Sequence, residues 1–255
     1  MSVFASVLIV LAVAGQIEPR SIASAVVRND AAALETIRRQ IQDELAESEE
    51  PSADRGDYTL AYVNWRLANL YPTQGEGIDK QTKKANKTIR EPLLKEAEAV
   101  LKALVERDPE DAESHALLGT VYGARISSMW SGMRLGPRAD KSLKRALELA
   151  PDNPRVAFQL GVGAFFKPGM FGGGDDKAQA ELERALELFA QQPPGAPWPH
   201  WGHVDAWIWL GQVHAKRKEW AQARTAYERA LELEPDHVFV RDELLPQLDR
   251  QSSSE

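Results

Sequence analysis

Residues 204–237 read VDAWIWLGQVHAKRKEWAQARTAYERALELEPDH, and this stretch contains the clearest structural pattern in the chain. Apolar residues recur at helical spacing in both of its halves, which predicts two amphipathic helices. The small residues Gly211 and Ala223 stand one in each half, where paired helices must cross closely. Pro235 ends the second helix, because proline lacks the amide donor and clashes with the preceding turn. The stretch therefore predicts a helix-turn-helix unit.

The same features recur upstream, which indicates an internal repeat. The phrase Arg-Ala-Leu-Glu-Leu occurs at 145–149, 184–188 and 229–233, and a Leu-Gly pair precedes each copy at 118–119, 160–161 and 210–211. The two halves of the earlier units align only if residues are inserted between them, which places the inserted residues on one edge of the array. We expect four units with enlarged internal loops, at about 61–111, 112–153, 154–203 and 204–237.

The positional pattern resembles the tetratricopeptide repeat. The matching residues of the last unit are Trp207, Leu210, Gly211, Ala223, Tyr227, Ala230 and Pro235. The resemblance implies an all-α fold, an α-α superhelix in which the first helix of each unit lines the inner surface. The loop at 168–174 and the apolar leader are also similar to the T-component proteins associated with TRAP transporters. That similarity implies a periplasmic protein that partners a solute-binding protein.

The segments that flank the array are interpreted from their composition. Residues 3–14 are continuously apolar, too few to span a bilayer, and match the core of a secretory signal peptide. We expect a signal peptide over 1–25, cleaved near 14 or 25; an uncleaved anchor and a buried N-terminal helix are the alternatives. A capping helix between Asp30 and Glu49 and a linker over 47–57 fill residues 26–57. The array and a C-terminal capping helix occupy 58–250, and 251–255 form a disordered tail.

Charge and cysteine content exclude several functions. The 255 residues include 31 Lys and Arg against 38 Asp and Glu, and the net charge of −7 disfavours nucleic-acid binding. The absence of cysteine excludes disulfides, thiolate metal sites and a lipid-modified N-terminal Cys. We therefore expect a periplasmic or secreted protein that is not a Cys-anchored lipoprotein. No catalytic constellation is present, so we expect a non-enzymatic protein without a metal, a cofactor or a stable membrane span.

The inner surface is the candidate binding site, because the positions that face it are unusually apolar. The candidate residues are Tyr62, Trp65, Phe158, Val162, Phe165, Phe166, Ile208 and Trp209. We interpret them as an apolar groove for a hydrophobic ligand or an extended apolar peptide. The alternative is that inserted segments fold over these residues and make them ordinary core.

Two further segments are candidate contact loops. The first insertion is locally basic, with Lys83, Lys84 and Lys87, and the last loop of the array contains Trp198 and Trp201. Tryptophan is favoured at interfaces, so Trp198 and Trp201 either form a contact surface or close over the last unit. The basic insertion is either a partner-docking surface or a solvated loop or loop-helix. His200 and His203, beside these tryptophans, lack the further ligands that a metal site requires.

The glycine-rich loop over 165–177 is not expected to bind phosphate. A phosphate loop needs a Lys-Ser or Lys-Thr pair after its glycines, whereas Asp175 and Asp176 follow here. We expect this loop to turn tightly, to pack Met170 and Phe171 inward, and to cap the next helix with one of the two aspartates.

Two classes of function follow from these features. We expect a protein–protein interaction scaffold in the periplasm or cell envelope. The alternative is a transport accessory that uses the apolar groove to bind a hydrophobic ligand or a solute-binding protein.

Overall fold

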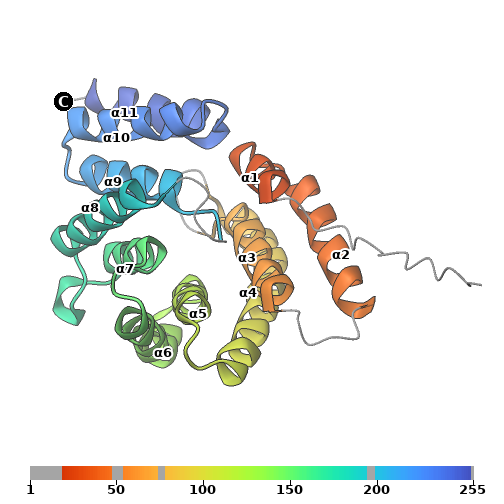
Figure 1. Cartoon of the computed structure of the whole chain (residues 1–255). Helices are drawn as coiled ribbons and strands as arrows, with labels where there is room; N and C mark the ends of the chain where they lie inside the picture. Colours follow the sequence, from red (N-terminus) through yellow and green to blue (C-terminus); the bar gives the residue numbers. More distant parts are fainter. Residues whose placement is uncertain (1–18, 48–53, 74–77, 194–198, 254–255) are drawn as a thin grey trace, which may run out of the picture.

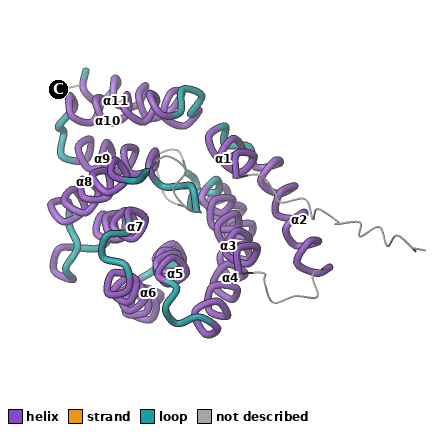
Figure 2. The backbone as a smooth tube through the Cα atoms, in the orientation of Figure 1, coloured by secondary structure: helices purple, strands orange, loops and turns teal. Residues whose placement is uncertain are grey.

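The computed structural model describes residues 19–47, 54–73, 78–193 and 199–253, and these residues form an all-α chain without a strand. Figure 2 shows the helices joined by loops that differ in length. The helices are α1 (Pro19–Val27), α2 (Ala31–Glu47), α3 (Asp54–Asn69), α4 (Lys80–Arg107), α5 (Ala112–Ala124), α6 (Met129–Leu149), α7 (Pro154–Phe166), α8 (Asp175–Gln191), α9 (His203–Lys216), α10 (Trp220–Leu233) and α11 (Leu245–Ser252), with the 3-10 turn η1 (Gly169–Phe171) and the π-helical turn η2 (Phe239–Leu244).

The four expected units are present as helix pairs. They are α3 with α4, α5 with α6, α7 with α8, and α9 with α10, and within each unit the two helices pack against each other. Figure 1 shows the pairs following one another around an arc, which brings the last unit back toward α1 and α3. The fold is therefore an all-α superhelical repeat array, as the sequence predicts.

Glycines mark the close crossings of the paired helices. A Cβ atom at Gly119 would lie 2.7 Å from Leu143 Cγ, and one at Gly161 would lie 2.7 Å from Leu182 Cγ. A Cβ atom at Gly211 would collide with the ring of Tyr227. At these three crossings, the second helix of the unit occupies the space that a larger side chain would need. The prediction that these positions must be small is therefore confirmed.

Most of the inserted residues are helical rather than looped. The first two insertions extend the second helix of their units backward, so that α4 has 28 residues and α6 has 21, against 14 in α10. The third insertion is a loop, which contains η1. The enlarged loops that we expected in the first two units are thus mainly helix extensions.

Side-chain caps start at least four of the described helices, including α6, where Ser128 accepts from the amide of Ser131. Asp79 accepts from the amide of Thr82, Asp111 from those of Glu113 and Ser114, and Asn153 from those of Arg155 and Val156. The prediction that an aspartate caps α8 is wrong. Gly174, with a φ of 108°, occupies that position, and Asp175 and Asp176 lie in the first turn. There they face the positive end of the helix dipole.

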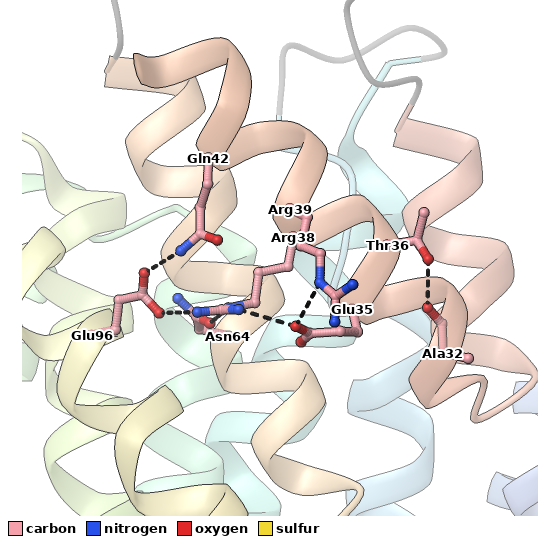
Figure 3. A network of polar contacts seen from close by, with 8 residues as sticks. All are labelled: Ala32, Glu35, Thr36, Arg38, Arg39, Gln42, Asn64 and Glu96. Carbon is pink, nitrogen blue, oxygen red and sulfur yellow. Dashed lines mark hydrogen bonds and ion pairs between the residues drawn. The ribbon is translucent and has the colours of Figure 1, made fainter.

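A polar network fixes the capping helix α2 on the first unit (Figure 3). Arg38 Nε donates to Asn64 Oδ1 at 2.7 Å, and its Nη2 lies 2.7 Å from Glu96 Oε2. Gln42 Nε2 donates to the other oxygen of Glu96 at 2.6 Å. Asn64 is fully buried and belongs to α3, whereas Glu96 belongs to α4. The network therefore ties α2 to both helices of the first unit.

The N-terminal region differs from the expectation in two ways. A further helix, α1, precedes α2, and its Ile22, Ala25 and Val26 belong to the same core as α2 and α3. The expected linker is shorter than 47–57, because α3 already begins at Asp54. The apolar segment 3–14 lies outside the described residues, and the second expected cleavage site lies within α1. Among the described helices, none combines the length and the apolar character needed to cross a bilayer.

The turn η2 and the helix α11 pack on the last unit. Val240 and Leu244 of η2 and Leu248 of α11 are buried in one core with Tyr227 of the last unit. The helix α11 continues through Gln251 and Ser252, which we expected to belong to the tail. The stacking face of the last unit is thus covered.

Candidate functional site

The residues predicted to form one apolar groove fall into two separate groups. Tyr62, Trp65 and Phe158 are buried beneath the loop that precedes α9, and Ile208 is buried against the C-terminal cap. Val162, Phe165 and Trp209 are half-buried, and Phe166 is exposed. A single groove along the whole inner surface is therefore not what the structure shows, although part of the surface is open.

Trp201 fills the first part of the inner surface. Its ring stacks on Tyr62 with centroids 4.9 Å apart, and lies 5.8 Å from Trp65 and 6.0 Å from Phe158. Its Nε1 donates to the hydroxyl of Tyr58 at 3.3 Å. These residues are therefore core here, as in the alternative interpretation, but the loop that covers them joins α8 to α9 and is not one of the inserted segments. Trp201 is thus a structural plug, and Trp198 lies outside the described residues.

An ion pair closes the array beside this plug. Arg66 Nη1 on α3 lies 2.7 Å from Asp205 Oδ1 on α9, and the two side chains are 13% and 18% exposed. Arg66 also lies over the rings of Tyr62 and Trp65. The candidate residues identified from the sequence include neither Arg66 nor Asp205. The available signal was a pair of opposite charges on the inner helices of the first and last units.

A second ion pair lies deeper in the same region. Arg155 Nη2 lies 2.7 Å from Glu113 Oε1, which also accepts from Asn153 Nδ2 at 2.7 Å. Burial, and next the negative charge of Glu113, raise the pKa of Tyr58 well above its ordinary value. Burial likewise raises the pKa of Tyr62. Both tyrosines are therefore neutral hydrogen-bonding groups at physiological pH.

A cleft of about 390 Å³ lies where the first and last units meet. Its lining combines apolar side chains from α1, aromatic side chains from α3 and the 199–203 loop, and polar side chains; these include Ile22, Val26, Tyr62, Trp201, Arg66, His203 and His237. His237 is buried, and its Nδ1 has no hydrogen-bond partner among the described groups. Burial lowers the pKa of His237 and of His203. The cleft therefore offers uncharged imidazoles beside aromatic rings, and no pattern in the sequence indicated it.

An open aromatic patch lies farther along the inner surface. It consists of Phe165 and Phe166 on α7 and Trp209 on α9, whose ring centroids are 5.2–5.3 Å apart in T-shaped pairs. Lys216 Nζ lies 4.9 Å from the centre of Phe165 and 2.6 Å from Asp175 Oδ1. This aromatic patch contains three of the predicted groove residues, and Phe166 is 69% exposed.

Other predicted contact residues lie on the edge of the array. Lys83, Lys84 and Lys87 are exposed on the first turns of α4. The prediction that Met170 and Phe171 pack inward is wrong, since they are 85% and 65% exposed. The η1 turn is held by its backbone instead, with the Gly174 amide bonded to the Ala164 carbonyl at 2.9 Å. No cluster of three or more His, Asp or Glu side chains suited to a metal occurs in the described part of the chain.

Comparisons with known proteins agree with the repeat. A model of the tetratricopeptide repeat family matches residues 204–237. Protein O-mannosyl-transferase TMTC1 of mouse is 28% identical over 156 residues, and that of human is 27% identical over the same length. These alignments cover 61% of this chain but only 14% and 15% of the two transferases. The chain thus resembles a short part of them.

Two solved structures share the fold over most of the chain. The HusA haemophore of Porphyromonas gingivalis has a TM-score of 0.57 and 25% identity, with 78% of this chain and 91% of that one covered. A thermophilic tetratricopeptide-repeat protein of Thermus thermophilus has a TM-score of 0.57 and 19% identity, with 93% and 98% covered. This chain is therefore an all-α helical repeat array, in which one segment matches the tetratricopeptide repeat.

Proposed function

We propose that the protein is a non-enzymatic scaffold that docks a partner protein on the aromatic patch of Phe165, Phe166 and Trp209. The exposure of Phe166 carries this proposal. Trp201 fills the neighbouring inner surface, so the patch is the part of the predicted groove where a partner can contact several aromatic rings. Burying a large apolar side chain contributes about 1.5–3 kcal/mol, enough for a local anchor.

The surroundings of the patch suit an extended segment of a partner. A hollow of about 200 Å³ adjoins Phe165 and is lined by Gln212, Lys216, Gln247 and neighbouring residues. Glutamine side chains both donate and accept hydrogen bonds, so they satisfy the backbone of a bound extended segment. We therefore infer a partner segment with one apolar anchor over Phe166 and a backbone that passes the glutamines.

The setting that we propose is the periplasm or cell envelope. The apolar residues 3–14 support export, and the similarity of the loop at 168–174 to the TRAP-associated proteins supports a role beside a transporter. Export is tested by fractionating native cells and sequencing the N-terminus of the mature protein. Recovery of the protein in the cytoplasm with the leader intact rejects this setting.

A photo-crosslinker placed at Gln212 in the native envelope tests the docking proposal. We expect one dominant crosslinked partner with the wild-type patch, and its loss with Phe166→Asp. Ala103→Asp is the matched control, since Ala103 is an exposed residue in the second half of α4, away from the patch. Equal crosslinking in the Phe166→Asp protein rejects this patch as the docking surface.

The second candidate function is a transport accessory that carries a hydrophobic ligand. The cleft between the first and last units supports it, because its aromatic and imidazole lining suits a flat apolar ligand. The structural similarity to the HusA haemophore extends over 91% of the haemophore chain, and it points to haem as the first ligand to test. Under this proposal the ligand lies between α1 and the ring of Trp201.

Titration with haemin, followed by the Soret band, tests the carrier function. We expect saturable binding by the wild type and its loss with Ala23→Trp, because Ala23 lines the cleft and an indole there would fill it. Ala32→Trp, at an exposed position on α2, is the matched control. Absence of saturable binding, or equal binding by Ala23→Trp, rejects the carrier function and leaves the scaffold proposal unaffected.

A further inference from the structure

We propose that one edge of the array binds the surface of an anionic lipid bilayer. We call this edge the insertion edge. It consists of three segments: residues 80–91 at the start of α4, residues 125–141, which include the first part of α6, and residues 167–172, which contain η1. The first helices of successive units run in the same direction in such an array, so their C-terminal ends and the insertions that follow share one edge. The inference is independent of whether the aromatic patch docks a partner.

Contacts between the insertions join them into one surface. Arg90 of α4 donates to the carbonyl of Ala124 at the end of α5, at 3.1 Å. Arg125 forms an ion pair with Glu98 of α4. Desolvation lowers the pKa of Arg125, Glu91 opposes this, and the positive charges of Arg134 and Arg138 add to the lowering. These contacts place the segment that joins α5 to α6 beside α4.

The third insertion is attached to the second. Lys167 Nζ, which precedes the η1 turn, lies 2.6 Å from Asp140 Oδ2 on α6. The insertion edge therefore continues from α4 over α6 to η1, without a gap in the order of the units.

Large apolar side chains project from this edge. Their exposed fractions lie between 65% and 85%, and they are Met129, Trp130, Met133, Met170 and Phe171. All of them lie in insertions rather than at repeat positions, so the packing of the array does not require them. A capping box between Ser128 and Ser131 fixes the first turn of α6, which holds Trp130 outward on a rigid helix start.

The same insertions contain exposed basic side chains. They are Lys83, Lys84, Lys87, Arg134, Arg138 and Lys141, all exposed. Within the described part of the chain, Arg134, Arg138 and Lys141 form no ion pair, and the carboxylate of Asp140 is occupied by Lys167. The chain as a whole has a net charge of −7, so the positive charge of this edge is opposite in sign to that of the whole chain. Lys and Arg held within a Debye length of an anionic membrane each add to the attraction.

The shape and composition of the edge favour a lipid surface over a protein partner. The apolar side chains project one by one from helix starts and a turn, whereas a peptide-binding surface presents a hollow like the one beside Phe165. Tryptophan, phenylalanine and methionine flanked by Lys and Arg suit the interface between headgroups and acyl chains. The array would then lie on the membrane with its inner surface free for a partner.

Co-sedimentation of the full chain with vesicles tests this inference. The two vesicles are phosphatidylcholine alone and phosphatidylcholine mixed with phosphatidylglycerol. We expect binding to the mixed vesicles only. The double reversal Arg134→Glu with Arg138→Glu should lower the partition coefficient by on the order of 100-fold, because it replaces two attractive charges near the headgroups with two repulsive ones.

Two further variants make the result specific. Trp130→Ser with Met133→Ser should weaken binding while leaving the charge unchanged. Lys102→Glu with Arg250→Glu changes the net charge equally at exposed positions away from the edge, and it should bind as the wild type does. All variants keep residues 1–18, so any contribution from them is common to all.

Equal binding to both vesicles, or wild-type binding by the edge variants, overturns the proposal. An acidic protein captured through Trp130 and Arg134, without vesicle binding, would assign the edge to a protein partner instead and would also overturn it. Far-ultraviolet circular dichroism of each variant shows that loss of binding is not loss of the fold.

Discussion

Arg66 and Asp205 are separated by 139 residues in the chain, yet Arg66 Nη1 lies 2.7 Å from Asp205 Oδ1. The pair connects the first helix of the first unit with the first helix of the last unit. A solenoid held only by contacts between neighbouring units would have no such link. This array is therefore closed by a specific long-range contact, and the inner surface beside it is determined by that closure.

Removal of either partner should destabilise the closed array. We expect Arg66→Ala and Asp205→Ala each to lower the free energy of unfolding by about 2 kcal/mol, because each leaves a mostly buried charge without its partner. A double-mutant cycle by urea unfolding should give a coupling energy of about 1–2 kcal/mol. A coupling near zero would show that the pair does not close the array.

Truncation of Trp201 should open the inner surface. We expect Trp201→Ala to cost about 2–4 kcal/mol, since it removes contacts with three aromatic rings and leaves a cavity. Urea unfolding measures the loss, and added indole should restore part of it by filling the cavity. Trp130→Ala is the control, because Trp130 is 81% exposed and its removal should change the stability little.

The close helix crossings predict opposite effects for two glycine substitutions. Gly211→Ala should destabilise the protein by about 1–3 kcal/mol, because the added Cβ collides with the ring of Tyr227. Gly123→Ala should stabilise it by about 0.5–1 kcal/mol, because nothing lies near a Cβ there and alanine favours the helix. Thermal unfolding of both variants distinguishes crossing contacts from helix propensity. Equal effects at the two positions would contradict the packing described for α9 and α10.

Stability should decrease at mildly acidic pH because of His237. Burial lowers its pKa in the folded state below the ordinary value of 6.5, so the unfolded state binds the proton more readily. The stability that neutral His237 contributes is therefore complete above about pH 6.5, and it falls as the pH decreases toward the folded-state pKa. The lowered pKa of His203 acts in the same direction.

Urea midpoints measured between about pH 7.5 and pH 5 test this dependence, with a maximal slope of about 1.4 kcal/mol per pH unit for each histidine. His237→Gln should reduce the slope, because it removes the imidazole whose pKa is lowered by burial. The negative charge of Asp205 raises the pKa of His237, whereas the positive charge of Arg66 lowers it. Repeating the measurement in the Asp205→Asn background removes the contribution that raises the pKa.

The helix pairs, their crossings and most of their caps follow from the amino-acid sequence alone. These features are local or lie within one repeat, so they leave a periodic pattern. Gly211 faces Tyr227 because both belong to one uninterrupted unit, and Asn153 caps α7 because it directly precedes Pro154. For the same reason the family model matches the last unit, into which no residues are inserted.

The open and the buried apolar residues of the inner surface, by contrast, are distinguished only by the tertiary structure. Phe158 and Phe166 lie about two helical turns apart in one helix. The sequence pattern assigned both to one groove, yet one is 1% exposed and the other 69%. The difference arises from Trp201 and from the closing pair of Arg66 and Asp205, which are contacts between distant units. Such contacts depend on the curvature accumulated over the whole array, and no periodicity in the sequence records that curvature.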